Sequence, residues 1–396
     1  MRIDWKTGTA YCFVHFSVEV LCFFLLYKIF GGFLLWWAIC VAFDTLAFVP
    51  QALFGALCEK YPGFRPGLTG GILIMSGALI MLLSAAGMTG KLPGGLMPGD
   101  IDSITDMGRF IAFQMTGLIL LTAGNALIHV SGALATLRVS EGRLSESALF
   151  VGGGSFGVIT GRLLAGTSGM AWLPFLLIAA ATVVMVFTDR RIRNAALPDG
   201  KPAGASFFDF DAFPCAHDIA APRSAWAVIA VLFAVVAVRA YIGYGIPTAW
   251  NKTSLQTLFL FLFMGIGKIL GGILSDLFGA RRLGIISCLL AVPLLLVSDN
   301  IMWLSLIAVA LFSMTMAVTL GGLVSILKTH PGVAFGITTI ALWLGSMPVF
   351  LFGIPEQTVC NILIASMSVL AAAGLFFVLK DKRDVRRQSR AERKEL

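Results

Sequence analysis

Charged residues are scarce in this sequence. Asp, Glu, Lys and Arg make up 13% of the 396 residues, whereas hydrophobic residues make up 58%. Soluble globular proteins carry about 25% charged residues, and no soluble fold has an interior large enough to hide this much apolar surface. The composition therefore excludes a water-soluble protein and predicts that lipid surrounds most of the chain.

The sequence also lacks the motifs of disulfide frameworks, zinc sites, nucleotide hydrolysis and enzyme catalysis. The seven cysteines include no C-x-x-C pair, which argues against a disulfide framework and a zinc site. No Walker motif is present, so nucleotide hydrolysis does not drive this protein. No nucleophile–base set is evident either. We therefore do not expect an enzyme, and we expect no cofactor and no bound metal.

Instead, the sequence contains long apolar runs of about 20 residues. They predict an all-α polytopic membrane protein with twelve transmembrane helices in two pseudo-symmetric six-helix bundles. The bundles are expected at 1–188 and 224–380, with a Pro-containing linker at 189–223 and a basic tail at 381–396. The expected spans are 8–30, 33–57, 67–88, 108–136, 146–167, 170–188, 224–247, 253–275, 283–298, 300–327, 332–353 and 357–379.

The positive charges are distributed asymmetrically around these spans. If both termini face the cytoplasm, 22 of the 29 Lys and Arg residues lie in cytoplasmic segments, four lie outside and three lie within spans. This asymmetry predicts cytoplasmic termini and a multi-pass protein of a bacterial inner membrane. The net charge of +8 is then an anchor to anionic membrane lipids, and we expect no nucleic-acid partner.

One pattern occurs at matching places in the two halves. Gly272-x-Leu274-x-Asp276 precedes Arg281 and Arg282 at the start of the ninth span. Gly55-x-Leu57-x-Glu59 precedes Arg65 at the start of the third. Each acid ends a helix beside a basic turn, where it can pair with an Arg or cap the N-terminus of the next helix.

This doubled pattern resembles the loops that join helices 2 to 3 and 8 to 9 in the major facilitator superfamily. The resemblance covers the whole chain and implies a monomeric secondary transporter in which these loops act as conformational latches. The second copy matches well. The first departs from the pattern, because Glu59 replaces the usual Asp and Tyr61-Pro62 place Gly63 one residue late.

Charges within the spans are costly, about 3 kcal/mol or more each, and they are unevenly spread. The third, sixth, ninth and twelfth spans have none in their interiors, which predicts that these four helices face lipid. His15 and Glu19 share one face of the first helix, with Glu19 ~16 Å deep, near the midplane. Burial disfavours the charged carboxylate, so we take Glu19 as a proton carrier, with Asp44 in support.

Alternatives remain open for these residues. Glu19 can be a structural ion-pair partner, and Asp44 is equally a proton site or a partner for a basic residue. Arg239 must pair with Glu19 or Asp44, or bind an anionic substrate, because a buried Arg keeps its proton. Lys268 is expected in a structural or gating role. A metal site of His15, Glu19, Asp44 and His129 is the minor alternative.

The fifth span carries a face of small residues. Gly153, Gly157 and Gly161 recur at every fourth position, as expected for close contact between helices. The segment 124–165 resembles the helix 4–5 region of the fosmidomycin-resistance-like branch of the superfamily, with His129 as the helix 4 histidine. It departs from that branch at Val130 and Arg162, where prolines are usual.

The narrower resemblance implies proton-coupled export of a small polar or drug-like solute. We therefore predict a proton-coupled exporter with a substrate cavity lined by His15, Asn125, His129 and Arg239. An importer or facilitator of the same fold is the alternative. A transporter-like sensor without turnover is a less favoured one, because the second latch is complete and acids lie at the midplane.

Overall fold

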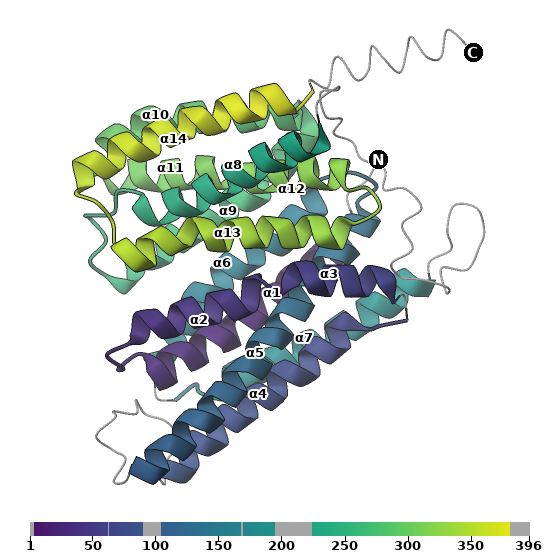
Figure 1. Cartoon of the computed structure of the whole chain (residues 1–396), viewed down its shortest axis with the longest axis vertical. Coiled ribbons are helices and arrows are strands. Elements are labelled where there is room, and N and C mark those ends of the chain that lie inside the picture. Colours follow the sequence, from purple (N-terminus) through teal and green to yellow (C-terminus); the bar gives the residue numbers. More distant parts are fainter. Residues whose placement is uncertain (1–3, 62, 90–103, 168, 195–223, 381–396) are drawn as a thin grey trace.

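The computed structural model describes residues 4–61, 63–89, 104–167, 169–194 and 224–380, and helices dominate it (Figure 1). In this part of the chain, 12 helices are long and apolar enough to cross a membrane. They confirm the twelve predicted spans, and the predicted boundary at Asp299-Asn300 falls between α10 and α11. The protein is therefore a multi-pass membrane protein.

The elements fall into two groups in Figure 1. The first contains α1 (Trp5–Leu25), the π-helix η1 (Leu26–Phe30), α2 (Trp36–Phe48), α3 (Gln51–Lys60), α4 (Pro66–Thr89), α5 (Ile104–Val139), α6 (Ser145–Ala165) and α7 (Leu173–Asn194). The second contains α8 (Ala225–Gly245), α9 (Ser254–Phe278), α10 (Ala280–Val297), α11 (Met302–Ser313), α12 (Thr315–Ile326), α13 (Pro331–Phe352) and α14 (Gln357–Val378). Helix α7 continues to Asn194, past the predicted end of the first bundle at 188.

Two of the expected spans are interrupted helices. The second span is divided between α2 and α3 at Val49-Pro50, because proline lacks the N–H that would continue the backbone ladder. The tenth is divided between α11 and α12 at Met314.

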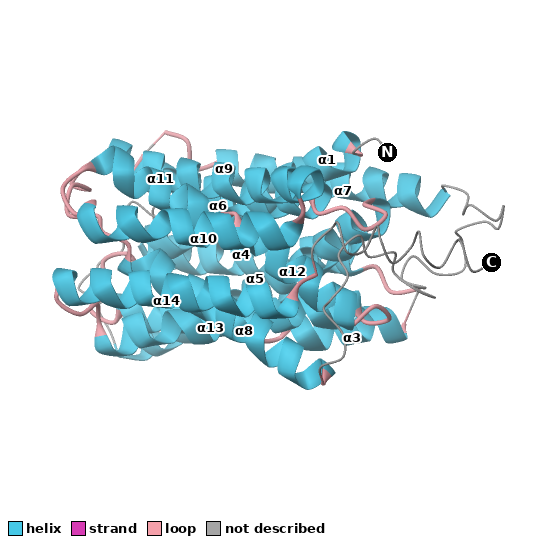
Figure 2. Cartoon of the chain, turned by 90° about the horizontal axis from the view of Figure 1, so that it is seen from above, coloured by secondary structure: helices cyan, strands magenta, loops and turns pink. Residues whose placement is uncertain are grey.

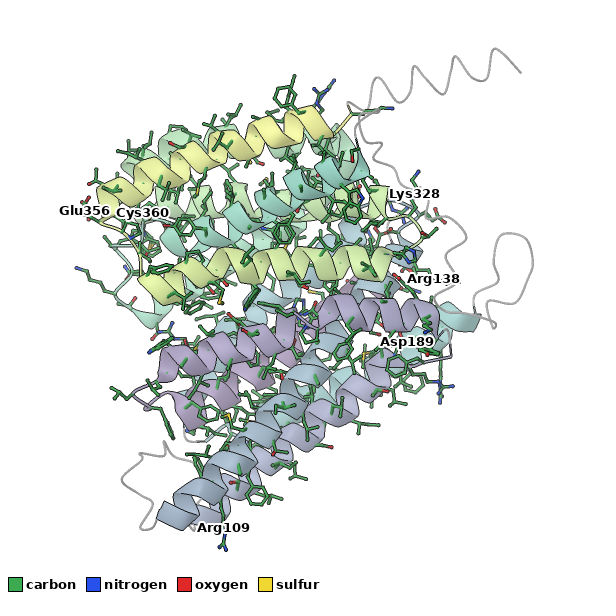
Figure 3. The ribbon with its side chains drawn as sticks, viewed as in Figure 1. Arg109, Arg138, Asp189, Lys328, Glu356 and Cys360 are labelled. Carbon is green, nitrogen blue, oxygen red and sulfur yellow. The ribbon has the colours of Figure 1, made fainter. Side chains whose placement is uncertain are left out.

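The helices run side by side between two ends (Figure 2). We call the end at which α3 and α9 stop the latch end. Figure 3 places Arg138, Asp189 and Lys328 at the latch end, and Arg109 and Glu356 at the opposite end. The charges predicted to lie on opposite sides of the membrane are thus separated along the helix axes.

The outer helices carry large apolar side chains on their exposed faces. These residues include Leu79 on α4, Phe187 on α7, Leu290 on α10 and Leu370 on α14, each more than half exposed. Helices α4, α7, α10 and α14 are the third, sixth, ninth and twelfth spans. These exposed apolar faces agree with the prediction, drawn from missing charges, that the four helices border lipid.

Candidate functional site

Two helices of the first bundle bring the central polar residues together. His15 and Glu19 project from α1, and Asn125 and His129 project from α5. All four side chains are buried, with Glu19 7% and His129 6% exposed. The predicted pairing of His15 with Glu19 on one helix face is confirmed, since His15 Nε2 lies 3.8 Å from Glu19 Oε1.

The glycine face of α6 allows this arrangement. A Cβ added at Gly153 would lie 2.2 Å from the Cys12 carbonyl oxygen of α1, and one at Gly157 would lie 2.4 Å from that of Phe16. A Cβ at Gly161 would lie 2.5 Å from the Val20 oxygen, and one at Gly154 would lie 2.3 Å from His15 Nε2. The small residues therefore let the α6 backbone lie against α1, as the sequence predicts.

Both histidines have one ring nitrogen committed to a backbone carbonyl. His15 Nδ1 lies 2.8 Å from the Phe150 oxygen, and His129 Nδ1 lies 2.9 Å from the Asn125 oxygen. A carbonyl oxygen only accepts hydrogen bonds, so each Nδ1 carries the hydrogen. The two Nε2 atoms then face each other 2.8 Å apart.

Glu19 completes this group, which we call the triad: His15, Glu19 and His129. Its Oε1 atom lies 3.4 Å from His129 Nε2 and accepts a hydrogen bond from Asn125 Nδ2 at 3.2 Å. Two Nε2 lone pairs and a carboxylate oxygen thus converge, with Asn125 as the donor to Glu19. In neutral imidazoles with hydrogen on Nδ1, both Nε2 atoms are acceptors. A hydrogen bond between the two Nε2 atoms therefore requires one additional hydrogen.

Lys268 reaches this region from the second bundle. It projects from α9, and its Nζ donates to Ser155 Oγ of α6 at 2.8 Å. Its charge lies within electrostatic reach of Glu19 and Arg239. Lys268 also lines a small pocket between the bundles with Ser147, Ala148, Val151, Met316, Ala317 and Leu320. The structure therefore places Lys268 beside the triad, rather than at the latch.

Asp44 and Arg239 lie outside the triad. Asp44 on α2 is half-buried, and it has no hydrogen-bond or ion-pair partner among the described residues. Arg239 on α8 is buried, yet it forms no ion pair with Glu19 or Asp44, and its Nη1 atom has no hydrogen-bond partner in the described chain. The pairing of Arg239 with one of these acids, one of the alternatives from the sequence, is absent from this conformation.

The two predicted latches make equivalent contacts across the bundles. Asp276 accepts hydrogen bonds from the backbone N–H groups of Leu144 (2.9 Å) and Ser145 (3.0 Å) and from the Ser145 hydroxyl. It therefore caps α6 of the first bundle, whereas the sequence offered a cap on the next helix or a pair with an Arg. The reason is that Gly272, one turn earlier, brings α9 against α6: a Cβ there would lie 2.3 Å from Ala148 Cβ.

Glu59 does the same for the second bundle. It accepts hydrogen bonds from the backbone N–H groups of Gly332 (2.6 Å) and Val333 (3.4 Å), and its second oxygen lies 3.1 Å from His330 Nδ1. Gly55, one turn earlier, meets the α13 backbone, because an added Cβ would lie 2.3 Å from the Gly332 carbonyl carbon. The first copy, which departs from the family pattern in sequence, is therefore complete in structure.

The basic residues of the latches are less closely engaged. Arg281 stacks over the Phe376 ring, 4.3 Å from its centroid, at the end of α14. Arg282 also interacts with another group. Arg65, in contrast, is exposed and has no hydrogen bond or ion pair with any described residue. The acids and glycines of both latches contact the opposite bundle.

Comparison with known proteins agrees with this geometry. No family model and no curated protein matches the sequence. Among solved structures, a transporter of the major facilitator superfamily, FucP in the outward conformation, aligns over 95% of this chain and 99% of its own, with TM-score 0.63 and 16% identity. A bacterial homologue of the iron transporter ferroportin, outward-facing with soaked iron, covers 95% and 98%, with TM-score 0.66 and 13% identity.

A third solved structure, the human organic anion transporter TETRAN, aligns over 94% of this chain and 100% of its own, with TM-score 0.54 and 14% identity. The chain has the major facilitator fold. The latches and the six-plus-six helix order are the features that the sequence shares with that fold.

The triad also satisfies one requirement of a metal site. Its three ligand atoms lie within 4.8 Å of one another, although Asp44, which we had grouped with them, is not part of the set. Zinc bonds of about 2.0–2.1 Å in tetrahedral geometry hold two imidazole nitrogens roughly 3.3 Å apart. The observed 2.8 Å between the Nε2 atoms is shorter and matches an N–H···N hydrogen bond. The spacing therefore favours a proton over a metal ion.

Several partners in this site were not identified from the sequence. Ser155, which binds Lys268, and Phe150, whose carbonyl oxygen fixes His15, both belong to α6. The i, i+4 glycine pattern indicates that α6 packs closely, but it does not indicate which polar groups on that helix reach the neighbours. Cys22, whose Sγ lies 3.5 Å from Asn125 Nδ2, follows Glu19 on the same face of α1 and was interpreted only as a buried apolar residue.

Proposed function

We propose that this protein is a secondary transporter that moves a small organic solute by alternating access and couples that movement to protons. The major facilitator fold and the two latches support transport. The triad supports coupling, and the 2.8 Å distance between the His15 and His129 Nε2 atoms is the observation that carries the proposal. Protons and membrane lipid are then its constant partners, in keeping with the expectation from sequence.

The triad holds one proton in a low-dielectric setting. A hydrogen placed between the two Nε2 atoms gives the imidazole pair one positive charge, which the Glu19 carboxylate 3.4 Å away balances. Loss of that hydrogen leaves a buried carboxylate with Asn125 as its one hydrogen-bond donor among the described residues, and two opposed lone pairs. Glu19, His15 and His129 therefore act as one carrier, and the proton belongs to the group rather than to one residue.

Lys268 links this carrier to the movement of the bundles. It belongs to the second bundle, but its hydrogen bond to Ser155 holds its charge within reach of Glu19. A cation at this position competes with the proton for the carboxylate. Movement of the bundles changes the distance between Lys268 and the triad, and it therefore changes how tightly the triad holds a proton. Asp44, also within electrostatic reach of Glu19, supports this exchange.

The conformation is closed at the latch end. Glu59 joins α3 to α13 there, and Asp276 joins α9 to α6. The Lys and Arg distribution assigns this end to the cytoplasm of a bacterial inner membrane, so the state is outward-facing, like the FucP and ferroportin-homologue structures. In the exporter that we propose, solute arriving from the cytoplasm displaces the proton. An importer or facilitator with the same site, or a sensor without turnover, are the alternatives.

Solute flux in proteoliposomes tests this function. With an imposed pH gradient, the wild type should move candidate organic solutes together with protons, which a trapped pH dye reports. Glu19→Gln fixes the neutral side chain, so it should abolish gradient-driven flux while solute binding persists and loses its pH dependence. The control Glu141→Gln replaces an exposed acid of the α5–α6 loop and should behave as wild type. Gradient-driven flux in Glu19→Gln would refute Glu19 as part of the carrier.

The orientation has its own test. Cysteines introduced at Lys252 and Lys328, in a background without native cysteines, should react with impermeant reagents added from opposite sides of the membrane. Labelling of Lys328→Cys from the outside would contradict a cytoplasmic latch end.

A further inference from the structure

Asn125 contacts two members of the triad at once. Its side-chain Nδ2 donates to Glu19 Oε1 at 3.2 Å, and its backbone oxygen lies 2.9 Å from His129 Nδ1. The side chain is buried, and it is the one donor to Glu19 among the described residues. A single residue outside the triad thus fixes the tautomer of one histidine and supplies the hydrogen bond to the carboxylate.

The triad offers a proton two places. One lies between the Nε2 atoms of His15 and His129, 2.8 Å apart, with Glu19 ionised beside them. The other is the Glu19 carboxyl group, with both imidazoles neutral. The second arrangement separates no charges, so a buried site favours it unless the carboxylate is stabilised. A hydrogen bond donated to the ionised form provides that stabilisation.

The hydrogen bond from Asn125 reaches the oxygen on which this choice depends. Glu19 Oε1 lies 3.4 Å from His129 Nε2, which is longer than a normal hydrogen bond, and the same atom accepts from Asn125. A hydrogen on Oε1 would weaken the bond from Asn125, because a carboxylate is a better acceptor than a neutral acid. Donation by Asn125 therefore opposes transfer of the proton to Glu19.

Little besides Glu19 fixes the orientation of the Asn125 amide. Its Oδ1 atom is buried and has no hydrogen-bond partner, and the other contact of Nδ2 is the Cys22 thiol at 3.5 Å. A thiol is both a weak donor and a weak acceptor, so it can pair with either amide atom. The charge of Glu19 therefore orients the amide: Nδ2 faces a carboxylate, whereas Oδ1 would face a protonated acid.

Few other groups face Glu19. Helix α6 brings no side chain to its Cβ, because an added Cβ at Gly157 would lie 2.7 Å from that atom. The titratable groups that face Glu19 or act on it from a distance are His15 and Cys22 on α1, His129 on α5, Asp44 on α2 and Lys268 on α9. Of these groups, none donates a hydrogen bond to the carboxylate in this conformation.

We infer that Asn125 is a positioning residue that confines the proton to the His15–His129 pair and keeps Glu19 ionised. As an account of the proton that the transporter carries, this inference rests on the proposed function. While Nδ2 donates to Glu19, the carrier is a protonated imidazole pair with a counter-ion. Without that donor, the N–H bond at Nε2 breaks, an O–H bond forms at Oε1, and the positive and negative charges cancel.

Infrared difference spectroscopy of the purified full-length protein in lipid bilayers tests this role without any solute. A protonated carboxyl and a carboxylate absorb at different frequencies, so a pH titration reports where the proton goes. In the wild type, the histidine bands should titrate without a carboxylic acid band from Glu19. Asn125→Leu should show that band, with a midpoint about one pH unit higher, a tenfold tighter hold on the proton. The band should be absent from Asn125→Leu combined with Glu19→Gln.

Two control variants separate the hydrogen bond from its surroundings. Gln114 is a buried amide on the same helix that donates to the Met81 oxygen at 3.0 Å and also has an unpartnered Oε1 atom. Gln114→Leu makes the matched amide-to-leucine change away from the triad and should titrate as wild type. Cys22→Ala removes the other contact of the Asn125 amide and should also show no acid band.

A measurement on the wild type keeps the test decisive if Asn125→Leu does not fold. Carbon NMR of carboxyl-labelled glutamate, assigned with Glu19→Gln, should show an ionised Glu19 at every pH at which the histidine pair gains its proton. A Glu19 carboxyl that becomes protonated in the wild type, or an Asn125→Leu protein without the new band, would overturn the inference.

These outcomes are separable from those of the transport test. Protonation of Glu19 in the wild type would refute the role of Asn125 and leave Glu19-dependent coupling standing. Gradient-driven flux that is indifferent to Glu19→Gln, with the infrared and NMR results as predicted, would refute coupling through the triad and leave the role of Asn125 standing.

Discussion

The two bundles are alike at the latch end and different in the middle. At the latch end, Glu59 of α3 caps α13 and Asp276 of α9 caps α6, each four residues after a glycine that meets the opposite bundle. In the middle, the first bundle holds the triad, whereas the second holds Arg239 and Lys268. The contacts between the bundles at the latch end are thus duplicated, but the buried polar side chains in the middle are not.

This difference separates two roles. A capping acid on a helix N-terminus needs only backbone N–H groups, which every helix offers, so the same device works in both halves. The buried polar groups in the middle instead depend on particular side chains, such as Glu19 beside His129 and Lys268 bound to Ser155. The predictions below test whether the middle is as asymmetric, and the latch end as symmetric, as the structure shows.

The largest effect should come from the triad. His129→Gln removes one of the two facing Nε2 atoms, so the shared hydrogen loses an acceptor and gradient-driven transport should fall more than tenfold, at least about 1.4 kcal/mol. The control is Glu141→Gln, which changes an exposed residue of the α5–α6 loop outside the triad and the latches. Transport assays under a pH gradient measure both. Equal effects of the two substitutions would show that the middle of the first bundle is not special.

The α1–α6 packing should give the next largest effect. Gly153→Ala would place a Cβ 2.2 Å from a carbonyl oxygen of α1 and should reduce the stability of the fold by about 1–3 kcal/mol. Gly63→Ala is the matched control, because an added Cβ there meets nothing within 4 Å. Thermal melting in detergent compares them. A Gly153→Ala protein as stable as wild type would contradict the close approach that positions His15 and Glu19.

The latch acids should produce smaller and equal effects. Asp276→Asn and Glu59→Gln each replace a charge at a helix N-terminus, so each should weaken closure by about 1 kcal/mol, roughly a fivefold shift in the conformational equilibrium. Spin labels at Lys60 and Lys328, one in each bundle, report the distance across the latch end. A shift in the Asp276 variant alone would mean that the first copy closes nothing.

The smallest effect is expected at the N-terminal cap of α1, the first helix of the first bundle. Asp4 caps α1 by accepting from the Thr7 N–H at 3.1 Å, whereas Ser224, the equivalent residue of α8, makes no such bond. Partial burial raises the pKa of Asp4, but the hydrogen bonds from Thr7 and the charge of Arg191 outweigh it and hold that pKa below its ordinary 3.8. Asp4→Asn should cost at most about 1 kcal/mol, after screening of this partly exposed group.

The pH dependence of that cost has a definite sign. Because the folded pKa of Asp4 is depressed, its contribution is fully present above the unfolded value near 3.8 and disappears as the pH falls through the lower folded value. Melting curves of wild type and Asp4→Asn should therefore differ at neutral pH and converge only under strong acid. A difference that vanishes already near pH 6 would contradict the cap.

The sequence predicted the helices, their order and the outer four of them, because lipid imposes long apolar runs and excludes charge. It also placed His15 and Glu19 on one face, since a four-residue spacing on a helix fixes that relation whatever the packing. Both latches were identified from their glycine and acid. The capping of α6 by Asp276 was not predicted, because the pattern does not indicate which helix N-terminus of the opposite bundle lies next to this acid.

Contacts between the side chains of different helices could not be predicted from the sequence. The rotation of α5 decides that His129 faces His15, and the rotation of α2 decides that Asp44 does not join them. Such rotations are set by side-chain packing along the whole length of each helix. The unpaired state of Arg239 is of the same kind, since a sequence shows that a charge needs a partner but not that the partner is missing.

The shared hydrogen of the triad can be observed directly. The chain has four histidines, so nitrogen NMR of histidine-labelled protein in bilayers resolves His15 and His129 by comparison with His15→Gln and His129→Gln. We predict that both rings are protonated at Nδ1 and that one hydrogen between the Nε2 atoms couples their signals. That coupling should be lost in Glu19→Gln. Hydrogens on Nε2 of both rings, with no coupling between them, would contradict the account of how this protein carries a proton.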